Sequence, residues 1–267
     1  MDSGQPQVVA HRGASHDVPE HTLGAYMRAI DAGADALECD VRLTADGHLV
    51  CVHDRRVERT SDGRGRVSTL ELAQLEGLDW ASWKRAHPAA TGEMPDRDRG
   101  KILTLRRLLS AVADSDRRVE VAVETKHPTR YAGQVERELV DVLDHFGWAR
   151  SRREPSPVRV MSFSTRALQR VRAMAPGLPL VLLMHSPSLR YRDGVLPRGV
   201  HVAGISVRTL RDDGWYVDRL HAQGHRVHVW TVDQPDDVRR CQEAGVEAII
   251  TNRPDAVLAQ LGRSASA

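Results

Sequence analysis

The sequence predicts an α/β protein, a closed barrel of parallel strands with helices on the outside, formed as a single domain. Apolar, strand-like runs alternate with helix-like runs along nearly the whole chain, which is typical of parallel strands joined by crossover helices. An open, doubly wound sheet would carry a G-x-G-x-x-G pattern after its first strand, and the residues found there, HRGASHDVPEH, lack it. The 267 residues would suffice for one large or two average domains, and barrels of about 250 residues commonly form one.

Composition and charge narrow the classes of function. The hydrophobic fraction of 41% is sufficient for a core, and no apolar stretch approaches the roughly 18 residues that a membrane helix requires. Basic and acidic residues number 38 and 36, which argues against a nucleic-acid surface, and the four Tyr, two Phe and five Trp offer few platforms for stacking bases. We expect no nucleic-acid partner and no integral membrane segment. The sequence leaves the oligomeric state open.

The N-terminus and the cysteines bear on location. The first residues, MDSGQPQVVAHRG, contain neither the basic region nor the apolar stretch of a secretory signal. The cysteines, Cys39, Cys51 and Cys241, are odd in number, and two of them lie inside apolar runs. This pattern favours buried, reduced thiols over a disulfide framework, and the two observations together predict a cytoplasmic protein.

The elements of the first half are predicted from periodicity, turns and caps. Residues 8–12 predict a strand, and residues 21–33 a helix that ends near its final glycine. The run ALECDVRL predicts a second strand, which an Asp-Gly turn separates from a further strand that reaches His53. Ser68, with Glu71 three residues later, predicts a capping box that opens a helix. The polar stretch that follows, KRAHPAATGEMPDRDRGK, predicts an exposed excursion before the helical pattern TLRRLLSAVAD.

The second half repeats the alternation up to a tail, GRSASA, that we expect to be disordered. The strand candidates of the whole chain number nine, one more than an eight-stranded barrel holds. One of GISV, WTV and AIITN is therefore expected to be only a short extension.

Acidic residues occupy the ends of two strand-like runs. Glu38 and Asp40 are two residues apart in a strand, so their side chains project from the same face. Adjacent carboxylates repel each other, which leaves three interpretations: a divalent-metal site, a pair neutralised by arginines, or solvated acids at a strand end. Glu124 follows the run VEVAV and either supplies a third oxygen ligand of the kind that Mg²⁺ or Ca²⁺ prefers or pairs with Lys126 on the same face.

Two histidines also end apolar runs. His11 and His53 suit the roles of general acid and base, because imidazole changes its protonation state near neutral pH. Zinc binding is the less favoured alternative, because zinc sites typically have histidine and cysteine ligands at closer spacing, and an acid-rich set favours a harder ion. Asp54 either orients a neighbouring group or begins the next loop.

Three further residues have two interpretations each. Arg12 suits bidentate binding of a phosphate, or it forms a structural salt bridge. Phe163 and Trp230 either wall a pocket or pack the barrel rim. We expect all of these side chains at the carboxyl ends of the strands, where barrels of this class have their active sites.

Short motifs that contain these residues are spread over nearly the whole chain. They are H-R-G (11–13), P-E-x-T (19–22), E-C-D-V (38–41), T-x-D-G (44–47), V-H-D (52–54), R-T-S-D-G (59–63), E-T-K (124–126), S-F (162–163), W-T-V (230–232) and I-T-N-R-P (250–254). In this order they resemble the glycerophosphodiester phosphodiesterase family. The resemblance implies one domain over residues 1–267, a distorted TIM (β/α)₈ barrel of the phospholipase C-like phosphodiesterase type, with a variable insertion at about 55–101 that helps shape the substrate entrance.

The resemblance also implies an activity, the metal-dependent hydrolysis of glycerophosphodiesters such as glycerophosphocholine and glycerophosphoethanolamine to sn-glycerol 3-phosphate and an alcohol. Transferred position by position, it implies one Ca²⁺ or Mg²⁺ held by Glu38, Asp40 and Glu124 and an acid–base pair formed by His11 and His53. It leaves open which histidine is the acid, and whether water or a glycerol hydroxyl attacks the phosphorus.

Substrate contacts are implied in the same way. Arg12 and Lys126 correspond to phosphate contacts, and Phe163 and Trp230 to pocket walls. The chain departs from the family where P-E-N-T is replaced by P-E-H-T, so Glu20 and His21 are expected near the pocket, with the histidine altering its shape or pH response. The family's I-P-T-L-E-E appears as I-L-T-L-R-R at 102–107, on an expected outer helix where the chemistry is unaffected.

Three alternatives remain. A lysophospholipase D-like enzyme acting on a lipid would favour an apolar lip in residues 64–100, and that stretch is mostly polar. A glycerophosphodiester-binding barrel without catalysis would not require two histidines together with three acids. In a purely structural barrel the acids would only pair with arginines, and no cation would stabilise the fold.

Overall fold

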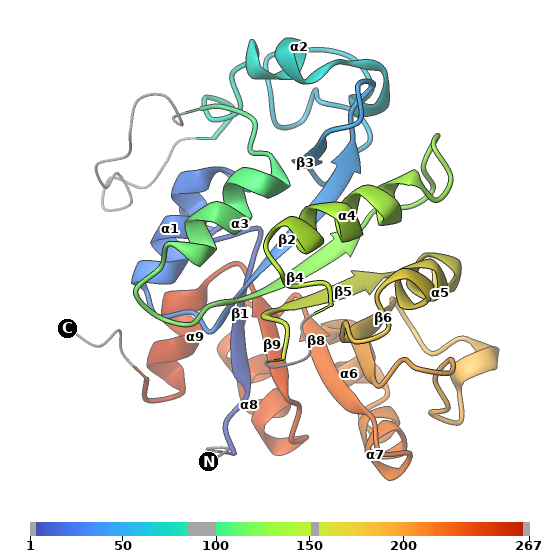
Figure 1. The fold of residues 1–267 in the computed structure, drawn as a ribbon. Coiled ribbons are helices and arrows are strands. Elements are labelled where there is room, and N and C mark those ends of the chain that lie inside the picture. The colour runs from blue at the N-terminus through green and yellow to red at the C-terminus, as the bar shows by residue number, and fades with distance from the viewer. Residues whose placement is uncertain (1–3, 85–99, 151–154, 264–267) are drawn as a thin grey trace.

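The computed structural model describes residues 4–84, 100–150 and 155–263 (Figure 1). Within these ranges eight parallel strands form a closed barrel, because β1 pairs with both β2 and β9. The barrel strands are β1 (Gln7–His11), β2 (Ala36–Leu43), β4 (Glu120–Thr125), β5 (Val158–Ser162), β6 (Leu180–Met184), β7 (Val202–Ser206), β8 (Arg226–Trp230) and β9 (Ala248–Thr251). The closed α/β barrel predicted from the sequence is confirmed.

The surplus strand is β3 (Leu49–Cys51), and the prediction that it would be one of GISV, WTV and AIITN is wrong. Those three segments overlap the ends of β7, β8 and β9, and all three strands pair in the barrel. β3 instead pairs antiparallel with β2, with Val41 opposite Cys51. The reason is the short connection, since residues 44–48 form a tight turn and a parallel return would need a crossover of a dozen or more residues.

Helices lie around the outside of the strands (Figure 1). They are α1 (Leu23–Asp31), α2 (Leu72–Glu76), α3 (Leu105–Ala113), α4 (Gln134–His145), α5 (Thr165–Met174), α6 (Val207–Asp212), α7 (Trp215–Ala222), α8 (Pro235–Glu243) and α9 (Pro254–Gln260), with 3₁₀ turns η1 (Val67–Thr69) and η4 (Leu189–Tyr191). Thr22 caps α1 by accepting a hydrogen bond from the amide of Ala25, and Gly33 follows the helix with a positive φ of 91°. No helix of the described residues is long and apolar enough to span a membrane.

The predicted capping box at Ser68 is wrong in its position. Ser68 lies in η1, and the extended backbone of Leu70 separates it from the next helix. Glu71 is the residue that caps α2, and the side chain of Gln74 accepts a hydrogen bond from its amide at 2.9 Å. The box is therefore shifted by three residues, because the 3₁₀ turn ends before the α-helix begins.

Three apolar clusters fix the barrel and its insertion. The largest fills the space between the strands and the helices, and a second, with Val9, Ala36, Ala122 and Met161 among its members, fills the inside of the barrel. A third, which includes Val57, lies in the segment after β3 and packs it onto that strand. Residues 85–99 of the predicted excursion and 264–267 of the predicted tail lie outside the described residues. The three cysteines are buried and free, as predicted.

Candidate active site

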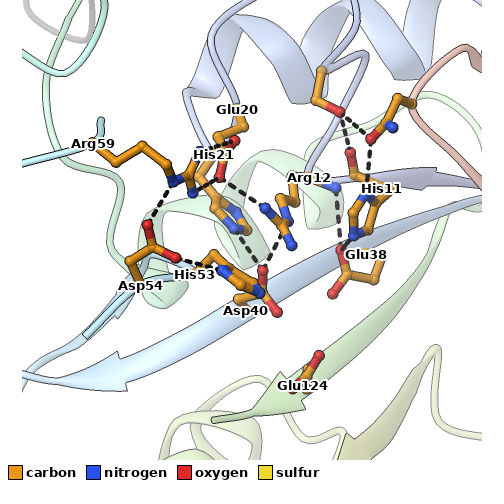
Figure 2. A network of polar contacts seen from close by, with 12 residues as sticks. His11, Arg12, Glu20, His21, Glu38, Asp40, His53, Asp54, Arg59 and Glu124 are labelled. Carbon is orange, nitrogen blue, oxygen red and sulfur yellow. Dashed lines mark hydrogen bonds and ion pairs between the residues drawn. The ribbon is translucent and has the colours of Figure 1, made fainter. Parts of the chain in front are cut away.

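Three carboxylates meet above the apolar interior of the barrel (Figure 2). Glu38 and Asp40 follow Ala36 on the inward face of β2, and Glu124 follows Ala122 on the inward face of β4. The strand register places Asp40 directly beside Glu124, and one carboxylate oxygen from each of the three lies within 4.8 Å of the others. Their exposed fractions are 2%, 1% and 7%, so the interpretation as solvated acids is wrong.

Two cations partly neutralise this cluster. Nε of Arg12 lies 3.0 Å from Asp40 Oδ2, and Nζ of Lys126 lies 3.2 Å from Asp40 Oδ1 and 2.9 Å from Glu124 Oε1. The backbone amide of Arg12, whose φ of 57° is in the left-handed region, donates to Glu38 Oε2 at 3.1 Å. Two side-chain charges thus face three carboxylates, and the cluster has room for further positive charge.

The ionisation of the three acids differs because their partners differ. Burial would raise the pKa of Asp40, but the hydrogen bond from His21 and the charges of Arg12 and Lys126 hold it well below its usual range. Burial and the charge of Asp40 raise the pKa of Glu124 to about 8 and the pKa of Glu38 well above its ordinary value. Without a bound cation, Asp40 therefore ionises more readily than Glu38 and Glu124.

His11 is held by an amide from the far end of the chain. Its Nδ1 lies 2.7 Å from Asn252 Oδ1, and the amide nitrogen of Asn252 donates to Asp233 Oδ2 at 2.6 Å. Because that amide points its oxygen at the imidazole, the Nδ1 of the ring donates and its Nε2 is the unprotonated nitrogen. Nε2 faces the cluster, 3.9 Å from Glu38 Oε2. Burial, followed by the charge of Arg12, lowers the pKa of His11 to about 4.

His53 is held by a carboxylate and comes from an unexpected strand. It follows β3, whose chain returns antiparallel to β2, so the prediction that it ends a strand of the parallel barrel is wrong. Its Nδ1 lies 2.7 Å from Asp54 Oδ1, and Arg42 donates from Nε and Nη2 to its carbonyl oxygen at 2.9 and 2.7 Å. Asp54 therefore orients the ring, which was one of the two roles that the sequence suggested for it. With 35% of its side chain exposed, His53 is more open to solvent than His11.

Glu20 links the two histidine regions (Figure 2). It accepts a hydrogen bond from Arg12 at 3.0 Å and two from Arg59 at 2.8 Å each, and Nε of Arg59 donates to Asp54 Oδ2 at 2.5 Å. Burial would raise the pKa of Glu20, but the hydrogen bonds of Arg59 and the charge of Arg12 lower it to about 2. The segment after β3 is thereby tied to the loop after β1.

His21 is buried and bonded on both ring nitrogens. Its Nε2 lies 3.0 Å from Asp40 Oδ2 and its Nδ1 lies 2.8 Å from the hydroxyl of Tyr26. Burial lowers its pKa, so the neutral ring donates through Nε2 to the carboxylate. The residue therefore holds Asp40 in place.

An aromatic wall, defined as Phe163, His185 and Trp230, lies at the ends of β5, β6 and β8. Phe163 stacks on His185 with ring centroids 4.6 Å apart, and Trp230 meets their edges at 5.6 and 5.2 Å. Phe163 is two residues beyond Met161, whose Cα is the register partner of Glu124, so the wall adjoins the acidic cluster. His185 was not predicted, although it too directly follows an apolar run.

The sequence interpretation also assigned no role to Asn252 and Asp233. Asn252 lies in the motif I-T-N-R-P just after β9, and Asp233 follows W-T-V just after β8. Their position after strands was the available signal. Their function in holding His11 depends on the closure of the barrel, which brings together residues 241 positions apart.

Comparisons with known proteins agree with this geometry. Residues 11–256 match the model of the glycerophosphoryl diester phosphodiesterase family. The chain is 47% identical over 255 residues to a probable glycerophosphodiester phosphodiesterase 1 of Mycobacterium tuberculosis, covering 94% of this chain and 91% of that protein. It is 32% identical to a glycerophosphodiester phosphodiesterase of Bacillus subtilis, covering 92% and 83%.

Solved structures support the fold. An Oleispira antarctica phosphodiesterase, determined in complex with the product sn-glycerol-3-phosphate, is similar with a TM-score of 0.82 and 23% identity, over 97% of this chain and 98% of that one. A glycerophosphodiester phosphodiesterase of Agrobacterium tumefaciens is similar with a TM-score of 0.74 and 24% identity, over 96% and 100%. With the family match spanning nearly the whole chain, the chain belongs to the glycerophosphoryl diester phosphodiesterase family of enzymes.

Proposed function

We propose that the protein hydrolyses glycerophosphodiesters, for example glycerophosphocholine and glycerophosphoethanolamine, to sn-glycerol 3-phosphate and an alcohol, using a divalent cation and two histidines. The observation that carries the proposal is the buried cluster of Glu38, Asp40 and Glu124, flanked by two imidazoles that are held in different ways. The names of the relatives and the product bound to the Oleispira neighbour give independent support.

The donor set suits Ca²⁺ or Mg²⁺. All three ligand atoms are carboxylate oxygens, which hard cations prefer, and they lie close enough together to bind one ion. When all three carboxyls are ionised, their charge exceeds that of the two nearby cations, Arg12 and Lys126. A divalent ion would offset that excess, which a purely structural ion-pair network does not. When bound, the ion supplies Lewis acidity that stabilises the negative charge gathering on the phosphoryl oxygens.

The two histidines are assigned different roles by their partners. His11 is neutral, with its unprotonated Nε2 toward the cluster, and this suits the general base that removes a proton from the attacking hydroxyl group. Burial lowers the pKa of His53, but the carboxylates of Asp40 and, on Nδ1, of Asp54 oppose that shift by stabilising the imidazolium form. This suits the general acid that protonates the departing alkoxide. Asn252 and Asp54 position the two rings.

The remaining residues bind or position the substrate. Arg12 and Lys126 are the cations beside the cluster, and we assign to them contacts with the non-bridging oxygens of the phosphate. Glu20 and His21 position Arg12 and Asp40 through the contacts described above. We assign to the aromatic wall the packing contacts with the apolar face of the substrate.

The direct test is the release of sn-glycerol 3-phosphate from glycerophosphocholine by the purified protein, after chelation and after reloading with Ca²⁺ or Mg²⁺. The proposal requires release that depends on the cation. Equal release before and after exhaustive chelation would remove the cation from the reaction, and release of the headgroup only from lysophospholipids would favour the lipid-directed alternative.

Replacing Trp230 by alanine is expected to raise KM by roughly tenfold while changing kcat little, because the side chain walls the site and does not contact the reacting groups. Steady-state kinetics with glycerophosphocholine measures both constants. Trp215→Ala is the matched control, since Trp215 is 43% exposed on α7 outside the aromatic wall, and its KM should be unchanged. A large fall in kcat for Trp230→Ala at constant KM would contradict the assignment.

Cation binding is expected to release protons below about pH 8. The pKa of Glu124 is raised to about 8, and this carboxyl must ionise to become a ligand. Affinity should therefore increase with pH and level off above about 8. Calorimetric titrations in two buffers of different ionisation enthalpy count the released protons, and a count of zero near pH 7 would contradict the prediction.

The same raised pKa predicts how the ion-free protein responds to pH. Glu124 contributes stability that is fully present below its ordinary pKa of 4.5 and is lost as the pH rises through about 8. Glu124→Gln should remove this loss from the pH dependence of the melting temperature. Glu120→Gln, at the opposite end of the same strand, should retain it.

A further inference from the structure

A surface pocket lies next to the acidic cluster, at the tip of β2. It is open to solvent, and its empty space of about 350 Å³ includes that solvent. Its walls come from three segments: the end of β2, residues 55 and 66–68 in the segment after β3, and the connection between β4 and α4. We call it the basic pocket, after the four cationic residues that line it, Arg42, Arg55, Arg66 and Lys126.

The charge of the basic pocket is only partly compensated. Lys126 pairs with Asp40 and Glu124, whereas Arg42, Arg55 and Arg66 form no ion pair within the described residues. No acidic residue is among the described residues that line it. Arg42 donates only to the carbonyl oxygen of His53, and within the described ranges the side chains of Arg55 and Arg66 form no hydrogen bond or ion pair. Gathering like charges without partners costs free energy, and an anion in the pocket would offset that cost.

The basic pocket continues the acidic cluster. Lys126 lines the pocket and also contacts Asp40 and Glu124, so the two sites share a wall. Arg42 follows Asp40 by two residues on β2, so both project from the same face of the strand. The aromatic wall lies on the β5–β8 side of the cluster, whereas the pocket lies on the β2 side. A diester bound with its phosphorus at the cluster would therefore extend one substituent toward the aromatic wall and the other toward the basic pocket.

We propose that the basic pocket binds the alcohol part of the substrate and selects alcohols that carry a second phosphate. The inference rests on the proposed hydrolysis and refines its substrate class. Arginine guanidinium groups bind phosphate with paired, charge-assisted hydrogen bonds, and those of Arg55 and Arg66 have no other partner within the described residues. A cationic headgroup such as choline would be repelled from the same pocket, so glycerophosphocholine is a substrate without being the preferred one.

A matched pair of substrates tests this selection. Glycerophosphoinositol and glycerophosphoinositol 4-phosphate differ only by one phosphate, and the cation-loaded enzyme should show a kcat/KM about tenfold or more higher for the phosphorylated one. The double variant Arg55→Gln/Arg66→Gln should reduce this ratio to about one and leave the unphosphorylated substrate within about twofold of the wild type. Neither residue contacts the acidic cluster or the histidines.

The control is Arg64→Gln/Arg106→Gln, which removes the same charge from exposed arginines that do not line the pocket. The control should retain the wild-type preference. Equal hydrolysis of both substrates by the wild type would overturn the pocket assignment alone, as would an equal loss of preference in both double variants. Hydrolysis of neither substrate by the cation-loaded wild type would instead overturn the proposed function and the pocket assignment with it.

Discussion

Replacing His11 or His53 by alanine is expected to lower kcat for glycerophosphodiester hydrolysis by about a thousandfold each. His11→Ala removes the only imidazole nitrogen that faces Glu38 among the described residues, and His53→Ala removes the imidazole that Asp54 orients. Release of sn-glycerol 3-phosphate at saturating substrate and cation measures the loss. His16→Ala serves as the control, because the His16 side chain is 47% exposed and, among the acids of the described residues, contacts only Asp17.

The two histidine variants are expected to differ when the leaving group is changed. In a glycerophosphodiester of 4-nitrophenol, the 4-nitrophenolate leaving group departs without being protonated by an acid. His53→Ala should therefore recover most of its rate on this substrate. His11→Ala should remain impaired, because the attacking group still requires a base. Recovery by His11→Ala in place of His53→Ala would reverse the assignment of acid and base, and losses of less than tenfold in both variants would exclude the two-histidine mechanism.

Chelation is expected to abolish hydrolysis, and readdition of Ca²⁺ or Mg²⁺ to restore it together with thermal stability. A cation present at about 100 times its Kd stabilises the fold by about 2.7 kcal/mol, which corresponds to a rise in melting temperature of roughly 5–10 °C for a chain of this size. Glu38→Ala and the isosteric Glu38→Gln should lose this rise, because one of the three buried ligands is gone.

The matched control for the cation is Glu120→Gln. Glu120 lies on the same strand as Glu124 but at its amino end, where it contacts Arg159 and Gln7 and no member of the cluster. It should retain the full cation-dependent rise in melting temperature. An unchanged rise in Glu38→Gln would place the cation elsewhere, and no rise in the wild type would favour the structural barrel.

The strands could be predicted because their signal is local. Each barrel strand is an apolar run, and the alternation of facing residues is fixed by the two-residue period of the extended chain. That period alone placed Glu38 and Asp40 on one face, as the structure confirms. It could not identify the surplus strand, because β3 resembles the barrel strands in composition. Only the short turn before it forces the antiparallel return.

The helix caps show the same limit at smaller scale. The pattern of Ser68 and Glu71 matched a capping box. In the structure, however, Ser68 is part of the 3₁₀ turn Val67–Thr69, and Glu71 is the N-cap of α2. The extended residues between η1 and α2 are positioned by the third apolar cluster, to which Val67 and Leu75 belong. Such packing is not visible in a window of four residues.

The sequence by itself determined the barrel class and the types of residue at the strand ends, because both follow from patterns within a few residues. Only the tertiary structure decided which residues these side chains contact. Barrel closure brings Asn252 to His11, and the return of β3 brings His53 beside Asp40. The segment after β3 supplies Arg55 and Arg66, which form no ion pair within the described residues. Partners far apart in the chain are selected by the register and closure of the sheet, and no local pattern records that selection.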